Sequence, residues 1–292
     1  MIRSSEPDTV KVDALFWLAW EYYLYNPDTS IFICNQAKAL SEKTSYFEGL
    51  AGAYSWLGYF SQLQGKTLPA LEYYSQSIPI YEKVKNYRDL ATNLNNISRI
   101  YFDQGDTLLS LEYYKKSLAY SETSADSIGI GLALNNIGYV YFTMKNLVDG
   151  LSYLNKSLNI RKKINDLQGI SEALINLGGI YRYQENHDSA LVYFFNALEI
   201  QRKINDKRAM CFSWNNIGHS QFKKSNFILA LQYADSSFNL SKSLNYIENT
   251  KLASELLYLL NKAEDKHRAA LEFYELHTQL KDSIKNETTQ KA

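Results

Sequence analysis

Helix-breaking residues are scarce in this sequence, which contains four prolines and thirteen glycines among 292 residues. Inside a helix, proline costs about 3 kcal/mol and glycine about 1 kcal/mol relative to alanine. Hydrophobic residues make up 46% of the chain, and its 24 tyrosines are a high number. Few helix breakers and many large side chains predict a mostly helical protein with a large core.

Cysteine is rarer still. Only Cys34 and Cys211 are present, in unrelated sequence contexts, which excludes a disulfide framework and a CxxC metal motif. We expect both to be buried free thiols. The four histidines have no HExxH motif and no other spacing of paired metal ligands, so no metal site is expected.

Neither sign of charge is in excess, because 31 basic and 31 acidic residues give a formal net charge of zero. Nucleic-acid-binding proteins normally have a basic excess or stripe, so nucleic acid is not expected as a partner. The GxSxG, GxxxxGK and GxGxxG motifs of common enzyme classes are also missing. We therefore predict that the chain is not an enzyme and uses no cofactor.

Long apolar runs are missing as well. No stretch approaches the roughly 18 residues of a membrane-spanning helix, and the start, MIRSSEPDTVK, lacks the apolar core of a signal peptide. We expect a soluble chain, either complete in itself or cut from a longer protein.

What the sequence does contain is an internal repeat with a constant spacing. Asparagine recurs at this spacing, followed two positions later by glycine or serine and then by tyrosine. The first series comprises Asn96, Asn136, Asn176 and Asn216, with Ser98, Gly138, Gly178 and Gly218 and with Tyr101, Tyr141 and Tyr181. A second series of small residues, each followed by leucine, comprises Ala70, Ser110, Gly150, Ala190, Ala230 and Ala270. A fixed period of about 40 residues predicts an array of supersecondary units, which overrides the two domains that the length alone would allow.

Each unit is expected to be a pair of antiparallel helices joined by a short turn. The segments Ser171–Gln184 and Ala190–Ile204 both place apolar or small residues on one helical stripe. Asp166 and Asp206 are expected N-caps of the helices that follow them. Pro79 lies inside the second helix of the second unit and is expected to kink or shorten it.

We predict a single all-α domain, residues 1–292, made of about seven such units. Their expected bounds are 8–47, 48–87, 88–127, 128–167, 168–207, 208–247 and 248–286. Glycine within a helix costs about 0.5–1 kcal/mol against alanine, so its recurrence at one position needs a packing reason. Small residues on both helices would let the two backbones of a pair approach closely.

This pattern resembles the tetratricopeptide repeat (TPR) family over nearly the whole chain. The family's signature positions are matched in order by Leu177, Gly178, Tyr181, Ala190, Phe194 and Ala197. Leu174 stands where the signature has tryptophan, the usual terminal proline is missing, and the unit is longer than the family's usual repeat of about 34 residues. These departures are typical of the extended repeats of kinesin-light-chain-like and bacterial regulatory members. The resemblance implies an α-α superhelix, the TPR solenoid, whose first helices line a concave groove.

The resemblance also implies where a ligand would bind. Asparagines at this position hold the main chain of a bound peptide in other TPR proteins, because an amide both donates and accepts hydrogen bonds. The predicted peptide-binding residues of the groove are Asn95, Asn96, Arg99, Asn135, Asn136, Tyr139, Asn176, Arg182, Tyr183, Asn215, Asn216, His219 and Lys223. Their charges are mostly positive, which predicts a ligand with carboxylates and apolar anchors. Alternatively, the asparagines bond between neighbouring repeats, or one asparagine of each pair serves each purpose.

We thus predict a non-catalytic protein–protein interaction module whose partner is a protein or an extended peptide. Both ends of the chain are similar to the flanks of extracytoplasmic TPR segments in bacterial sensor histidine kinases and related regulators. That similarity implies a sensory part of a signalling protein, a periplasmic setting and a membrane span beyond the Lys281–Ser283 tail; a cytoplasmic setting is the alternative. The alternative function is a structural or self-associating solenoid scaffold without a peptide ligand, for example a homodimer.

Overall fold

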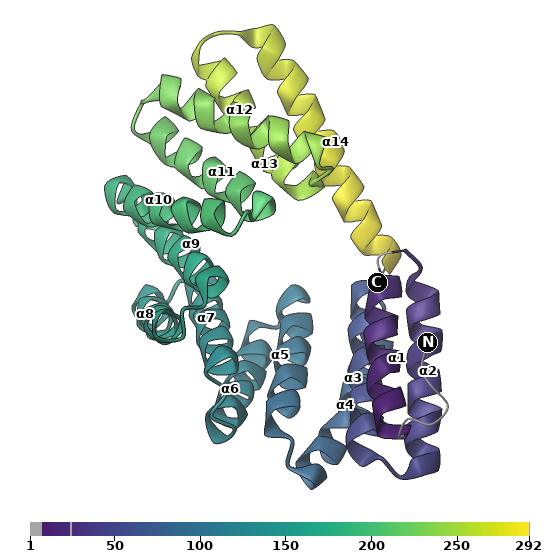
Figure 1. The fold of residues 1–292 in the computed structure, drawn as a ribbon. Helices are drawn as coiled ribbons and strands as arrows, with labels where there is room; N and C mark the ends of the chain where they lie inside the picture. Colours follow the sequence, from purple (N-terminus) through teal and green to yellow (C-terminus); the bar gives the residue numbers. More distant parts are fainter. Residues whose placement is uncertain (1–7, 24, 292) are drawn as a thin grey trace. The chain divides into compact units, whose positions relative to one another are not determined.

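The computed structural model describes residues 8–23 and 25–291, with side chains of the last helix as far as Ile284. These residues form fourteen α-helices and no strand (Figure 1). The helices are α1 (Asp8–Tyr23), α2 (Pro27–Thr44), α3 (Phe47–Leu63), α4 (Thr67–Val84), α5 (Tyr87–Asp103), α6 (Thr107–Thr123), α7 (Ser127–Thr143), α8 (Leu147–Lys163), α9 (Leu167–Tyr183), α10 (His187–Lys203), α11 (Lys207–Lys223), α12 (Phe227–Ser243), α13 (Ile247–Ala263) and α14 (His267–Lys291). The predicted all-α fold of about seven helix pairs is confirmed.

The observed helices begin a few residues before the segments that the apolar pattern predicted. In the fifth repeat, α9 begins at Leu167 rather than Ser171, and α10 begins at His187 rather than Ala190. The start of α9 follows directly from its cap: the Oδ1 atom of Asp166 accepts from the backbone N–H of Gly169 at 3.0 Å. The predicted N-caps at Asp166 and Asp206 are therefore confirmed.

The contacts divide the chain into two compact units, Met1–Ala133 and Leu134–Gln290. In the first unit, α3 packs against α1, α2, α4 and α5. In the second unit, α11 packs against α9, α10, α12 and α13. Within each unit, the first helix of one repeat therefore lies next to the first helix of the following repeat. That the whole chain is one domain stays a prediction.

The turns recur at a constant spacing, twice per repeat. At each of the twelve turns from the end of α2 to the start of α14, one residue has a left-handed backbone, with φ between 52° and 85°. These residues are Ser45, Gly65, Lys85, Gly105, Ala125, Lys145, Asn165, Glu185, Asn205, Ser225, Asn245 and Asp265. The next residue donates its N–H to a carbonyl of the last helical turn, as Asp166 does to Arg161 at 2.9 Å. Helices α2 to α13 thus end in a Schellman motif, and the donating residue becomes the N-cap position of the following helix.

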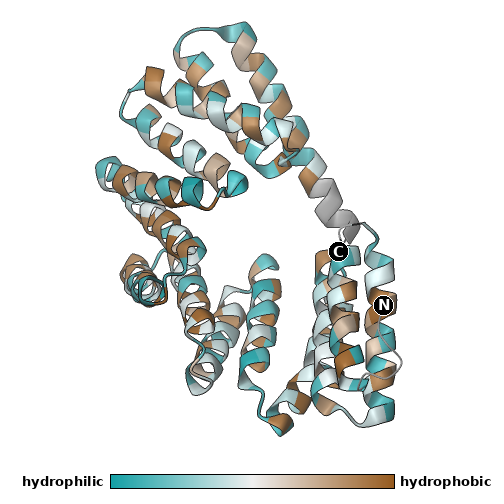
Figure 2. Cartoon of the chain, in the orientation of Figure 1, coloured by the Kyte–Doolittle hydropathy of each residue, from teal (hydrophilic) through white to brown (hydrophobic). Residues whose placement is uncertain are grey.

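Small residues bring the helices of a pair together. A Cβ atom added to Gly138 of α7 would lie 2.7 Å from Cγ of Leu154 and 3.1 Å from the carbonyl oxygen of Gly150, both on α8. The recurrent glycine therefore has the expected packing reason. Figure 2 shows hydrophobic and hydrophilic residues alternating along the helices, as expected for helices that bury one face.

The expectation that Pro79 shortens its helix was wrong. Helix α4 continues through Pro79 to Val84 and has 18 residues. Apolar contacts offset the missing hydrogen bond: Ile78 and Ile80, on either side of the proline, pack against a core that contains Tyr81, Leu90 and Leu94. Among the described residues, no helix is both long and apolar enough to span a membrane.

Candidate functional site

A pocket of about 520 Å³ lies in the second unit, on the face formed by α9, α11 and α13. Its lining residues are Arg182, Tyr183, Glu185, His187, Phe212, Asn215, Asn216, His219, Lys223, Leu252 and Glu255. Six of these belong to the predicted peptide-binding set, and they come from two successive repeats. The register of the repeats brings them together, because α9 and α11 are the first helices of neighbouring pairs.

Arg182 is a partly buried positive charge of this pocket that is hydrogen-bonded to a neutral side chain. Its Nη1 atom donates to Oδ1 of Asn216 at 2.6 Å, so a neutral amide is its hydrogen-bond partner. No ion pair among the described side chains involves Arg182, although Glu185 and Glu255 line the same pocket. Burial lowers the pKa of the Arg182 guanidinium. A partly buried cation without a carboxylate partner favours binding of an anion.

Two buried polar atoms of the pocket have no hydrogen-bond partner among the described residues. They are Nδ1 of His187 and Oδ1 of Asn215. A buried donor or acceptor without a partner costs about 1–3 kcal/mol, so a ligand that satisfies these atoms would be favoured. Phe212 and Tyr183 supply apolar surface at the rim, where they are 41% and 52% exposed.

His219 is held neutral by its surroundings. Burial lowers its pKa from 6.5 to about 4, and the nearby charges of Arg182 and Lys223 add to this effect. A neutral imidazole leaves Arg182 and Lys223 as the positive charges of α9 and α11 in this pocket.

This shift makes stability depend on pH. The unfolded chain binds a proton at His219 below about pH 6.5, whereas the folded chain does so only near pH 4. The stabilising contribution of neutral His219 is therefore complete above pH 6.5 and is lost as the pH falls to 4, by up to about 3 kcal/mol. We expect the free energy of unfolding of wild type minus that of His219→Gln, measured by urea unfolding, to fall by about 2–3 kcal/mol from pH 7.5 to pH 4.5. An unchanged difference at the two pH values would contradict this assignment.

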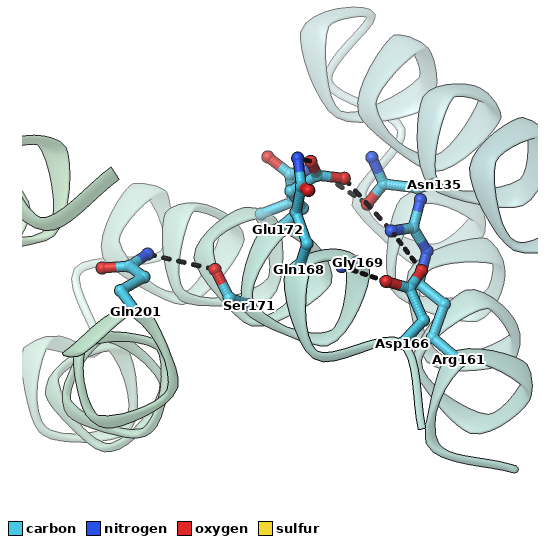
Figure 3. A network of polar contacts seen from close by, with 9 residues as sticks. Asn135, Arg161, Asp166, Gln168, Gly169, Ser171, Glu172 and Gln201 are labelled. Atoms are coloured by element: carbon cyan, nitrogen blue, oxygen red, sulfur yellow. Dashed lines mark hydrogen bonds and ion pairs between the residues drawn. The ribbon is translucent and has the colours of Figure 1, made fainter. Parts of the chain in front are cut away.

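The asparagines make contacts between neighbouring repeats in the second unit. The Nδ2 atom of Asn176 donates to Oδ1 of Asn135 at 3.1 Å, and Asn135 is 6% exposed (Figure 3). The Nδ2 atom of Asn215 lies 3.5 Å from the carbonyl oxygen of Asn249. These contacts favour the alternative in which some asparagines have a structural role. Asn216, which holds Arg182, lines the pocket as well.

The remaining predicted residues lie elsewhere. Asn95, Asn96 and Arg99 belong to the first unit, where the exposed Arg99 pairs with Asp103 of its own helix at 2.9 Å. In the second unit, Asn136 is half-buried on α7, and the Tyr139 ring packs edge-on against Phe142 with centroids 6.4 Å apart. The structure thus gathers six of the predicted residues, all from α9 and α11, into one pocket and leaves the others outside it, including Asn176 of α9.

Sequence reasoning missed Glu185 and His187 near the turn, and Phe212, Leu252 and Glu255. The register could have found some of them. Glu255 stands one full repeat after Asn215, and Leu252 stands one full repeat after Phe212. Only apolar residues reveal the register of the last repeat, so the asparagine series does not point to these positions.

Comparisons with known proteins agree with this fold. A family model described as tetratricopeptide repeat matches residues 49–123 and 129–203. No curated protein matches the chain. Among solved structures, the apo form of RapI is 18% identical, with a TM-score of 0.73 over 94% of this chain and 99% of RapI. A Rap protein complexed with competence and sporulation factor is 18% identical, with a TM-score of 0.61 over 94% of this chain and 77% of its own.

A third similar structure is a signal transduction ATPase with numerous domains and a tetratricopeptide repeat sensor, from Pyrococcus horikoshii. It is 17% identical, with a TM-score of 0.73 over 96% of this chain. The match spans 44% of the ATPase's own length. At these identities the likeness shows the fold alone.

Proposed function

This chain belongs to the tetratricopeptide repeat family, a protein–protein interaction fold, and we propose that it binds an extended peptide or protein segment in the pocket of α9, α11 and α13. The ligand presents a carboxylate to Arg182 and an apolar side chain to the rim. In this proposal the chain is the sensory or regulatory part of a signalling protein. The similar Pyrococcus horikoshii ATPase has a tetratricopeptide repeat sensor, and a similar Rap protein was solved in complex with competence and sporulation factor.

The single observation that carries the proposal is the state of Arg182. Its guanidinium is partly buried, its hydrogen-bond partner is neutral, and it faces a pocket that has room for several side chains. A peptide carboxylate would supply the missing negative charge, and the Arg–carboxylate pair is a strong charge-assisted contact. Lys223 of α11 lies in the same pocket and would add to the attraction.

A structural scaffold without a peptide ligand is the second candidate. The hydrogen bond between Asn176 and Asn135 supports it, because it joins neighbouring repeats and involves amides that a peptide would otherwise use. The two candidates differ in the expected role of Arg182. A peptide-binding module uses it to bind a carboxylate, whereas a scaffold needs no anion at that position.

The test is a screen of an array of random peptides, followed by calorimetry on the tightest binder. We expect Arg182→Gln to weaken binding about 10- to 100-fold, the value of one charged hydrogen bond of about 1.5–3 kcal/mol. Arg202→Gln is the matched control, because Arg202 is an exposed arginine of α10 outside the pocket. It should change the affinity less than about threefold.

A second arm removes the negative charge from the peptide. Amidation of its carboxylates should weaken binding to wild type and have little effect on the Arg182→Gln variant, as in a double-mutant cycle. Undiminished binding by Arg182→Gln, or an array without any binder, would count against the proposal and favour the scaffold.

A further inference from the structure

A second pocket, of about 630 Å³, lies in the first unit on the face formed by α1, α3 and α5. Its lining has a net negative charge, whereas the two basic and two acidic residues that line the pocket of the second unit balance one another. The lining residues are Asp13, Phe16, Trp20, Tyr46, Glu48, Gly49, Gly52, Ser55, Trp56, Tyr59, Tyr81, Asp89, Thr92, Asn93 and Asn96. Three are acidic, none is basic and six are aromatic.

The three carboxylates lack cationic partners. No ion pair among the described side chains of this unit involves Asp13, Glu48 or Asp89. Nδ2 of Asn86 donates to Glu48 at 2.7 Å and to Asp89 at 2.9 Å, which holds these two acids side by side without neutralising them.

The basic residues nearby are engaged elsewhere. Arg88, next to Asp89 in the chain, pairs with Asp126 at 3.4 Å. Lys83 lies over the ring of Phe47 at 4.7 Å. The mouth of the pocket therefore keeps an excess of negative charge.

The protonation equilibria agree with this excess. Burial, together with the charge of Glu48, raises the pKa of Asp13. Burial also raises the pKa of Asp89; the hydrogen bond from Asn86 and the charge of Arg88 oppose this effect, and the charges of Glu48 and Asp126 add to it. A cation that enters the pocket would relieve this repulsion.

The aromatic side chains form a connected group. The Trp56 ring lies 5.9 Å from the centroids of both Trp20 and Tyr59 and 6.5 Å from that of Phe16. The contact with Tyr59 is edge-to-face, at an interplanar angle of 85°. Electron-rich ring faces beside carboxylates are the surroundings in which proteins bind ammonium and guanidinium groups.

An adjoining hollow of about 450 Å³ extends the aromatic wall. It shares Asp13, Phe16, Trp20 and Trp56 with the pocket and adds Trp17, which is 73% exposed. Gly52 of α3 lets the Phe16 ring lie close to the α3 backbone, because a Cβ atom on Gly52 would lie 3.1 Å from that ring.

We propose that this pocket is a binding site for an organic cation, a quaternary ammonium or guanidinium group. Asp13, Glu48 and Asp89 attract its charge, and Trp20, Trp56 and Tyr59 contact its alkyl or planar surface. The cation is either a free small molecule or the basic side chain of a partner. The proposal does not depend on the pocket of the second unit.

Three probes test whether the ligand must be positively charged and whether it is a small molecule or a basic side chain. Choline, its uncharged isostere 3,3-dimethyl-1-butanol and N-acetyl-arginine amide are titrated into the full chain by calorimetry. Tryptophan fluorescence gives a second signal, because three of the four tryptophans line the pocket or the hollow. We expect a cation to bind at least about tenfold more tightly than the isostere.

The variant Asp13→Asn/Glu48→Gln should bind the cation at least about tenfold more weakly, and Trp20→Leu should weaken it as well. The matched control is Glu72→Gln/Glu122→Gln, which removes two exposed acids of the same unit outside the pocket. Urea unfolding of each variant checks that the fold is kept. Arg182→Gln should bind the cations as wild type does, which separates this site from the proposed peptide site.

The outcomes are distinct. Binding of choline alone identifies a small quaternary ammonium as the source, and binding of the arginine derivative alone identifies a basic side chain; both support the site. The proposal is overturned if neither cation binds, if the isostere binds as tightly as choline, or if the acid double variant binds undiminished.

Discussion

Replacing Gly178 with alanine is expected to lower the free energy of unfolding by about 1–3 kcal/mol, whereas the same change at Gly179 is expected to leave it unchanged or raise it by up to about 1 kcal/mol. A Cβ atom on Gly178 would lie 2.5 Å from Cε1 and 2.7 Å from Cδ1 of Phe194. Phe194 is fully buried, so its ring has no free space into which it could move. The nearest atom to a Cβ on Gly179 is Cε1 of Phe142, at an ordinary 3.7 Å.

The two variants are matched controls for one another, because they make the same change at adjacent positions of α9. Both replace a helical glycine by the best helix former, so propensity favours both equally. Their difference of about 1–4 kcal/mol therefore measures the contact with Phe194. Urea unfolding gives both values. A destabilised Gly179→Ala, or an unaffected Gly178→Ala, would contradict the packing reason for the repeated glycine.

The helix pairs could be predicted because short-range interactions specify them. Each turn uses the same backbone hydrogen bonds, so Asn165 and Glu185 adopt the same left-handed conformation despite different side chains. The constant spacing therefore predicts where the turns lie, even where the residue type alone would not. The glycine series could also be predicted, because the close helix contact in the second to sixth repeats leaves room for nothing larger than glycine or, at Ser98, serine.

The pockets were harder to predict because they depend on contacts between repeats. Arg182 contacts Asn216 of the next repeat, and no local pattern says whether an amide will bind a neighbour or a ligand. The acidic pocket of the first unit was missed for another reason. Asp13 and Trp20 belong to the first repeat, where the pattern fades, and Asp13, Glu48 and Asp89 follow no common period.

The repeat pattern also does not predict the buried positive charge of Arg161 in the second unit. Arg161 is 3% exposed, although it stands near the end of a helix, where a basic residue would normally be solvated. The equivalent positions of other repeats hold Tyr81, Ser121, Gln201 and Ser241, all buried. The residue type at this position varies from repeat to repeat, so the repeat pattern predicts that the position is buried but not which side chain it holds.

Arg161 is held by two carboxylates that follow it in the chain. Its Nη1 atom lies 3.3 Å from Oδ2 of Asp166 and 3.1 Å from Oε2 of Glu172 (Figure 3). Gly169 makes the space, because a Cβ atom there would overlap the guanidinium. The acids are more exposed than the arginine, at 24% and 42% against 4% for the side chains. The desolvation cost of this cluster therefore falls mainly on the cation.

From this asymmetry we expect that removing the acids costs more stability than removing the arginine. The double variant Asp166→Asn/Glu172→Gln keeps the helix cap but leaves a buried, unpaired cation, and it should lose about 3–5 kcal/mol of unfolding free energy. Arg161→Met leaves two acids that water can reach and fills the same space with an apolar chain, so its cost should stay below about 2 kcal/mol. Glu199→Gln, which breaks the exposed pair with Lys203 at 2.8 Å, is the control and should leave the free energy of unfolding nearly unchanged. If Arg161→Met proves the more damaging change in urea unfolding, the guanidinium is stabilising the fold through contacts other than these two charges.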